Sequence, residues 1–203
     1  MKKILFPTDF SEAANNAFIH ALEFAKIVNG ELVLLHTFEL PILDDQFFLV
    51  NYASIYDSIE IADFERFKNE IPKMKAIAAQ RNLEDIVIKH RLVNGDLLYN
   101  LKNVVANDKI DFVIMGTNSV SDWTSFFWSS NTGAVISGVD VPVLCVPIYS
   151  EYRKTHTIGF TTRFREKDKL ELRKVLKIAK KTNAKVKSLY VKTSNSDVSD
   201  DVI

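Results

Sequence analysis

The chain alternates short apolar runs with longer segments in which apolar residues recur at every third or fourth position. Lys3–Pro7 reads KILFP and Glu31–Phe38 reads ELVLLHTF. Runs this short and this apolar are typical of strands that are buried on both faces. Between the two runs, Ser11 can cap a helix whose alanine, phenylalanine and leucine residues lie along one side. A strand, a helix and a strand within about 35 residues predict a βαβ unit with parallel strands.

The alternation of strands and helices continues as far as Pro147. Apolar spacing predicts a helix over Ile59–Arg81, in which Pro72 predicts a kink or a break. Further elements are expected, in chain order, at Ile86–Val93, Leu97–Ala106, Phe112–Met115, from about Asn131, and at Val141–Val146. Five strands that alternate with four helices predict an α/β fold, namely a five-stranded parallel doubly wound sheet of the Rossmann-like kind.

Residues 39–58 follow neither the strand nor the helix pattern. They contain Pro41, two adjacent aspartates and several aromatic residues. A segment this apolar is a poor disordered linker. We expect an ordered excursion that packs on the body of the protein or on a partner.

The end of the chain repeats its beginning. At a constant offset of 154 residues, TIGFTTRFRE (157–166) falls on KILFPTDFSE (3–12), and no gap is needed through Leu189. A shared offset across strand, helix and strand indicates an internal repeat. We therefore expect a complete domain over 1–150 and an incomplete second repeat, a partial β-α-β unit, over 151–203.

Composition argues against several classes of protein. The chain has 26 Lys and Arg against 26 Asp and Glu, so its net charge favours neither a nucleic acid nor a membrane as partner. No window approaches the roughly 18 uncharged apolar residues of a transmembrane helix. Pro7 and Asp9 come too early for a signal peptide. The single cysteine, Cys145, fits a reducing cytoplasm.

No catalytic constellation is evident in the sequence. The four histidines lack cysteine or carboxylate partners at metal-ligand spacing, so no metal site is expected. There is no Gly-x-Ser-x-Gly elbow, no Walker lysine and no evident general base. The chain is expected to act by binding rather than as an enzyme.

The stretch Asp111–Pro147 suits a phosphate group. It combines a buried strand, Gly116, and a helix that opens with Ser130 and Asn131. Glycine lets the backbone approach a ligand, and a helix start offers N–H groups at a positive dipole end. The polar residues at the helix start would also serve as N-caps.

Four motifs together resemble those of a known family. They are ILFPTDFSE at the end of the first strand, VIMGTNS after the fourth, SSNT at a helix start and VPVLCVP as the last strand. With them the chain resembles the universal stress protein family, in particular its tandem kind with two such domains. The resemblance covers 1–147 as a complete domain and 157–191 as the beginning of another. It implies an adenine nucleotide alpha hydrolase-like fold, a cytoplasmic stress-response role and ATP as ligand.

The resemblance also implies where a nucleotide would lie. Thr8 and Asp9, at the end of the first strand, would face its ribose or adenine side, and Thr37 would offer backbone to the adenine edge. A carboxylate at a strand's carboxyl end is well placed to accept ribose hydroxyls. Asp9 would serve equally well as a cap for the turn before the Ser11 helix, so both roles stay open.

The glycine pattern of the site is incomplete. Nucleotide-binding members resemble G-x-x-G, nine residues, then G-S/T, and these places are filled here by Gly116, Ser119, Ser129 and Ser130. Where glycine serves a positive φ or a close approach, each serine costs about 1–2 kcal/mol, and about 2–4 kcal/mol together is roughly 30- to 1,000-fold in affinity. We expect weak or lost ATP binding. The alternative is a working ATP sensor with slow or no hydrolysis.

Two segments suggest protein partners. An apolar edge strand is a liability, and members of the family commonly pair through it, so a homodimer through residues 141–147 is expected. The aromatic run Trp123–Trp128 would either form a plug or partner-binding patch, or pack on its own domain. Together with the 39–58 excursion, the edge strand and the aromatic run support a third alternative for the function. In this alternative the chain is a structural oligomer-forming module with an unknown protein partner.

Overall fold

The computed structural model describes residues 1–40, 52–117 and 130–190. The chain divides into two compact units, Met1–Tyr152 and Arg153–Ile203. Each unit has a parallel sheet of its own.

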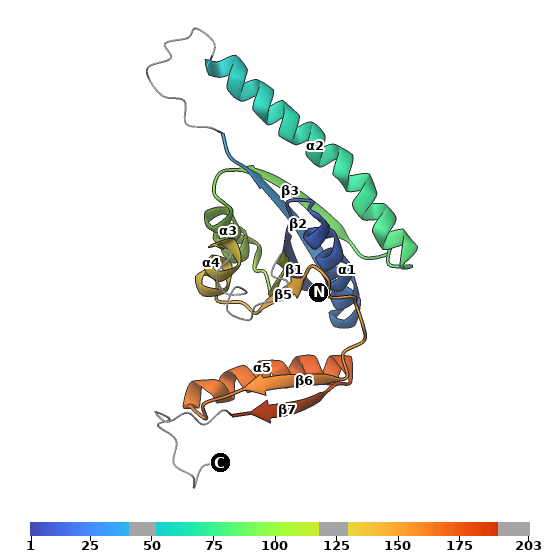
Figure 1. Cartoon of the computed structure of the whole chain (residues 1–203), viewed down its shortest axis with the longest axis vertical. Coiled ribbons are helices and arrows are strands. Elements are labelled where there is room, and N and C mark those ends of the chain that lie inside the picture. The colour runs from blue at the N-terminus through green and yellow to red at the C-terminus, as the bar shows by residue number, and fades with distance from the viewer. Residues whose placement is uncertain (41–51, 118–129, 191–203) are drawn as a thin grey trace. The chain divides into compact units, whose positions relative to one another are not determined.

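The first unit alternates strands with helices along the chain. In order these are β1 (Lys2–Pro7), α1 (Glu12–Val28), β2 (Gly30–Phe38), α2 (Tyr52–Gln80), β3 (Ile88–Asn94), α3 (Leu97–Asp108), β4 (Phe112–Thr117), α4 (Ser130–Gly138) and β5 (Val143–Pro147). The strands form one parallel sheet in the order β3-β2-β1-β4-β5 (Figure 1). This arrangement confirms the predicted five-stranded parallel α/β sheet.

Apolar side chains cover both faces of this sheet. On one face, Phe6 belongs to a buried cluster with Phe18 of α1 and Met74 of α2. On the other face, Leu5 belongs to a second cluster, which includes Leu101 of α3 and reaches α4. Because β1 is buried from both sides, its sequence is a continuous apolar run rather than an alternation.

Helix α2 differs from its predicted form. It runs without interruption from Tyr52 to Gln80, so the predicted break at Pro72 is wrong. Proline removes only one backbone donor, and the buried Phe67 and Met74 on either side hold the helix against the body. Residues 52–58, which were expected to be irregular, belong to α2. The rest of the expected excursion, 41–51, lies outside the described residues.

Two other boundaries differ from those predicted. Strand β4, which was expected to end at Met115, continues through Gly116 to Thr117. The last strand begins at Val143 rather than at position 141. Helix α1 ends at Val28, and its C-cap Asn29 adopts the left-handed conformation with φ 54°.

The second unit is a single β-α-β segment. It consists of β6 (Thr157–Thr161), α5 (Glu166–Thr182) and β7 (Lys185–Leu189), and its two strands pair in parallel. Both ends of α5 lie 154 residues after the corresponding ends of α1. The left-handed residues recur at the same offset, with φ 60° at Phe10 and 56° at Phe164. The β-α-β segments therefore share element bounds and backbone conformation.

Candidate functional site

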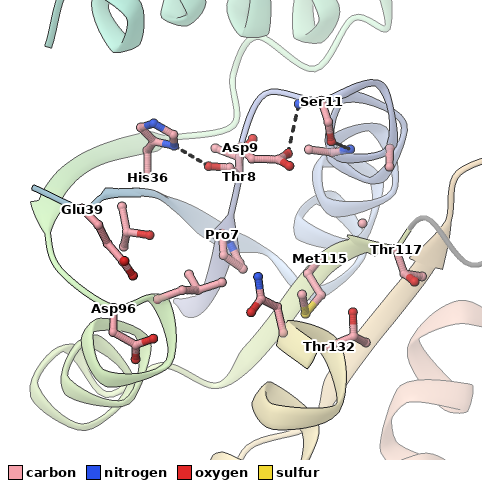
Figure 2. Close-up of a pocket in the computed structure, with 16 residues that line it drawn as sticks. Pro7, Thr8, Asp9, Ser11, His36, Glu39, Asp96, Met115, Thr117 and Thr132 are labelled. Atoms are coloured by element: carbon pink, nitrogen blue, oxygen red, sulfur yellow. Dashed lines mark hydrogen bonds between the residues drawn. The ribbon is translucent and has the colours of Figure 1, made fainter. Parts of the chain in front are cut away.

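A cavity of about 450 Å³ opens at the carboxyl ends of the central strands. Strand β1 pairs with β2 on one side and with β4 on the other. The chain adds β2 and β3 on the first side and then crosses over to add β4 and β5 on the second, so the strand order reverses beside β1. This is the place where open α/β sheets bind ligands. The ends of β1, β2 and β4 and the starts of α1, α3 and α4 line the cavity (Figure 2).

Five of the predicted site residues come together here. They are Thr8, Asp9, Thr37, Gly116 and Asn131. Ser119 and Ser129 lie outside the described residues, as does the aromatic run 123–128. Ser130 is the first residue of α4.

The loop after β1 is held rigidly by Thr8. The Oγ1 of this buried residue accepts a hydrogen bond from the Phe10 N–H (3.0 Å), and its own N–H donates to the Leu35 carbonyl (2.9 Å). Its carbonyl lies 2.7 Å from Nδ1 of His36, which donates to it (Figure 2). Phe10 adopts φ 60°, and its ring centroid lies 4.8 Å from that of His36. A left-handed phenylalanine costs about 1–2 kcal/mol, so these contacts fix a loop that would otherwise relax.

Asp9 caps the turn, as one of its two proposed roles required. Its Oδ1 accepts the Ser11 N–H at 3.0 Å, and the Ser11 hydroxyl in turn accepts the Ala14 N–H at 3.3 Å as the N-cap of α1. The exposed carboxylate also borders the cavity. The structural role is therefore observed, and the ribose role stays a prediction.

Gly116 is required for packing against α1. A Cβ at this position would lie 2.6 Å from the Ala13 carbonyl oxygen and 2.9 Å from the Ala14 backbone nitrogen. The expected role of this glycine, close approach of the backbone to a ligand, is thus accompanied by a stronger one, close approach of strand to helix. At the start of α4, Asn131 is exposed and Thr132 is buried at the cavity wall.

His36, Glu39 and Asp96 also line the cavity, although no motif in the sequence marks them as site residues. Asp96 does cap α3, because its carboxylate accepts the Tyr99 N–H at 2.7 Å. Glu39 follows β2 and lines the same cavity. Sheet topology could have predicted all three positions, because β2 and the turn after β3 end at the same edge of the parallel sheet as β1.

The described wall of the cavity is acidic. Asp9, Glu39 and Asp96 contribute carboxylates, and none of the described lining residues is lysine or arginine. The starts of α1, α3 and α4 offer partial positive charge toward a ligand. Within the described part of the chain, no group of His, Cys, Asp and Glu side chains is arranged to hold a metal ion. Partial burial raises the pKa of the Cys145 thiol, which disfavours the reactive thiolate.

A family model of the universal stress proteins matches residues 1–147, which include the whole sheet and the cavity. The chain belongs to the universal stress protein family. Universal stress protein MJ0577 of Methanocaldococcus jannaschii is 31% identical over 154 residues, which are 71% of this chain and 94% of that protein. The solved structure of MJ0577 aligns at a TM-score of 0.52 with 25% identity, covering 72% of this chain and 95% of that one.

Two other solved universal stress proteins share the fold. UspA from Lactobacillus plantarum has a TM-score of 0.58 and 18% identity, and covers 71% of this chain and 97% of its own. A universal stress protein from Archaeoglobus fulgidus has a TM-score of 0.72 at 18% identity. That alignment covers 95% of this chain and 68% of the other, so it extends into the second unit. Among the described helices, none has the length and apolarity that crossing a bilayer requires.

Proposed function

We propose that this universal stress protein acts by reversible binding of an adenine nucleoside or nucleotide in the cavity between β1 and β4, without turnover. The observation that carries the proposal is the convergence of Thr8, Asp9, Thr37, Gly116 and Asn131 on one cavity at the topological switch point. Its volume of about 450 Å³ falls within the range of small-molecule sites. A cytoplasmic stress-response role, acting through a binding event, follows from the family.

The cavity offers suitable groups for a base and a ribose. The buried Met115 at the end of β4 supplies apolar surface, and Thr37 at the end of β2 supplies backbone. The carboxylates of Asp9 and Asp96 are acceptors for ribose hydroxyls. A hydrogen bond to a charged group contributes about 1.5–3 kcal/mol. We therefore expect the nucleoside moiety to carry most of the affinity.

The phosphates have poorer surroundings. Asp9, Glu39 and Asp96 repel them, and the stretch 118–129 contains no lysine or arginine in its sequence to offset this. Ser119 and Ser129 stand where nucleotide-binding members have glycine. We expect affinity to fall as phosphates are added, so that ATP binds weakly or not at all.

Calorimetric titration of the full chain with adenosine, AMP and Mg-ATP tests this proposal. Adenosine and AMP should bind, and Mg-ATP should bind at least 10-fold more weakly than AMP. Asp9→Asn, which keeps a side-chain acceptor for the turn but removes the charge, should weaken adenosine binding about 5- to 30-fold. Glu12→Gln removes a neighbouring charge that does not line the cavity and should leave the affinity unchanged.

The outcomes separate the proposed function from its alternatives. Low-micromolar affinity for Mg-ATP would instead make the protein a working ATP sensor. No heat with any of the three ligands would leave an interaction module without a nucleotide. If the serines are the cause of weak ATP binding, Ser119→Gly with Ser129→Gly should raise the ATP affinity by roughly 30- to 1,000-fold.

A further inference from the structure

The net charge of zero conceals a separation of charge between the two units. Residues 1–152 carry 12 Lys and Arg against 20 Asp and Glu, a net charge of −8. Residues 153–203 carry 14 Lys and Arg against 6 Asp and Glu, a net charge of +8. A charge of this size on so small a unit favours association with an anionic surface.

Half of the basic residues of the second unit, seven of fourteen, lie on α5. The exposed basic residues of this helix, which form its basic face, are Lys167, Lys169, Arg173, Lys174, Lys177, Lys180 and Lys181. Lys169 and Lys174 pair with acidic residues of the same helix. In the described part of the chain the other five form no ion pair, so their charge is available to a partner.

The basic face is bordered by apolar side chains that have no cover. Leu170 is 58% exposed and Leu176 is 48% exposed. Leu22, which occupies the position of Leu176 in the first unit, is 0% exposed and belongs to a cluster that includes Met74 of α2 and Ile114 of β4. No described helix takes the place of α2 in the second unit. The face of α5 therefore combines positive charge with apolar contact surface.

The open side of the second sheet is different in kind. Leu5 and Val33, which α3 and α4 cover in the first unit, correspond at the offset of 154 to Gly159 and Lys187. These replacements suit a surface that stays in water. The exposed apolar residues that lack a packing partner in the second unit therefore lie on α5 and not on the open face of its sheet.

The first unit carries a surface of the opposite charge and of similar composition. The N-terminal half of α2 carries Asp57, Glu60, Asp63 and Glu65, together with two exposed apolar residues, Ile61 (62%) and Phe64 (52%). Glu65 pairs with Lys68 of the same helix, so the negative charge of this acidic face rests on the other three carboxylates. This acidic face precedes Phe67, the first described core residue of α2. Figure 1 shows this half of the helix running past the end of the sheet.

We propose that the basic face of α5 docks on the acidic face of α2 in a second copy of this chain. Charge complementarity and the paired apolar residues favour this partner over a nucleic acid, because a phosphate backbone would leave Leu170 and Leu176 without contacts. A two-fold arrangement forms the contact twice, once in each direction. Because the attraction is electrostatic at its rim, the association weakens as salt rises.

Sedimentation velocity of the full chain tests the proposal. All proteins carry Leu144→Lys, which removes association through β5 from the measurement. At 50 mM NaCl the parent should sediment as a dimer, and at 500 mM its dissociation constant should rise at least 10-fold. The variant Lys167→Glu/Arg173→Glu/Lys177→Glu should be monomeric at both concentrations.

A matched control separates position from net charge. The variant Lys154→Glu/Lys185→Glu/Lys187→Glu changes the charge of the second unit by the same amount, at exposed residues outside α5. It should remain a dimer at 50 mM NaCl. Far-UV circular dichroism of each variant checks that α5 is still folded.

A mixing experiment distinguishes contact between copies from contact within one. Asp57→Lys/Glu60→Lys/Asp63→Lys should be monomeric alone, as the α5 variant is. Mixed one to one, the two variants restore attraction in both directions, so a heterodimer should form. A mixture that stays monomeric, a parent that is monomeric at 50 mM NaCl, or a dimer unaffected by either reversal would overturn the proposal. So would a parent that stays monomeric but binds a fluorescein-labelled 20-nucleotide RNA.

Discussion

Gly116 lies where β4 passes the first turn of α1, and it has the tightest surroundings of any described glycine. A Cβ there would meet backbone atoms of Ala13 at 2.6 and 2.7 Å. Backbone in a capped helix start cannot yield as the end of a flexible side chain can. The residue thus links the wall of the cavity to the stability of the sheet.

We predict that Gly116→Ala lowers the free energy of unfolding by about 1–3 kcal/mol, as overpacking does elsewhere. Urea unfolding followed by tryptophan fluorescence measures it, since Trp123 and Trp128 both belong to the first unit. Gly159→Ala is the control, because its Cβ would meet only a Leu189 methyl at 3.5 Å. Gly159→Ala should not measurably change the free energy of unfolding, followed by circular dichroism. Equal stability of Gly116→Ala and the parent would contradict the packing argument.

His20 makes stability depend on pH. Burial lowers the pKa of this imidazole; the Ser150 carbonyl, 2.9 Å from Nε2, raises it by a smaller amount, and Arg81 lowers it further. The unfolded chain therefore takes up a proton at about pH 6.5, before the folded chain does. The contribution of His20 to the free energy of unfolding is therefore complete above about pH 6.5. It is lost as the pH falls from there toward the lower pKa of His20 in the folded chain.

Urea unfolding at pH 7.5 and pH 5.0 checks this prediction. The parent should lose stability at the lower pH, and His20→Gln should lose less. His156→Gln, at an exposed residue of the second unit, controls for removal of an imidazole as such. The same difference between the two pH values in parent and His20→Gln would rule His20 out. His90, whose pKa burial and Lys75 lower, contributes in the same direction.

At the scale of elements, β5 is the edge of the sheet, as its sequence predicted. Among the described strands it pairs with β4 alone, and the bonds beside it include Val113 N–H to the Pro142 carbonyl (2.9 Å) and Ile148 N–H to the Thr117 carbonyl (3.0 Å). Since bonding alternates along a parallel strand, the backbone groups of Val143 point away from β4. They are available to another strand, and Leu144 beside them is 44% exposed.

We predict a homodimer through β5, and we predict that Leu144→Lys weakens it at least 10-fold. A lysine on an edge strand opposes pairing by placing like charges together. Light scattering at tens of micromolar protein and 500 mM NaCl measures it, because high salt suppresses contacts between charged faces. Tyr149→Lys, at a 74% exposed position outside the strand, should leave the dimer intact. A monomeric parent under these conditions would refute the pairing.

Element type could be predicted from the sequence more securely than element ends. The apolar runs of β1 and β2 and the capping residue Ser11 are local signals, and the structure agrees with them. The break at Pro72 was wrong because tertiary packing on α1 outweighs one lost hydrogen bond. The extension of β4 through Gly116 was missed because pairing with β5 is not a local property.

At the scale of the molecule, the site was predictable only where a motif marked it. Thr8, Asp9, Thr37, Gly116 and Asn131 do meet in one cavity, because parallel strands bring their carboxyl ends to one edge. Glu39 and Asp96 lie there for the same reason but carry no motif. The charge separation was overlooked because whole-chain composition averages two units of opposite sign.

The two units also differ in the size of their cores. In the first, 28 of the 29 described buried apolar residues form the layers around the sheet, whereas the second contributes only Ala179. A unit with so little buried surface has little to offset its conformational entropy. Its stability is therefore expected to be the lower of the two.

We predict that the chain unfolds in two steps in urea at 500 mM NaCl, with the second unit unfolding first. Far-UV circular dichroism reports all helices, including α5, whereas both tryptophans belong to the first unit. The dichroism signal should therefore begin to fall at a lower urea concentration than the fluorescence changes. Lowering the salt to 50 mM should bring the curves together if docking of α5 stabilises it. Coincident curves at 500 mM NaCl would show instead that the units unfold as one.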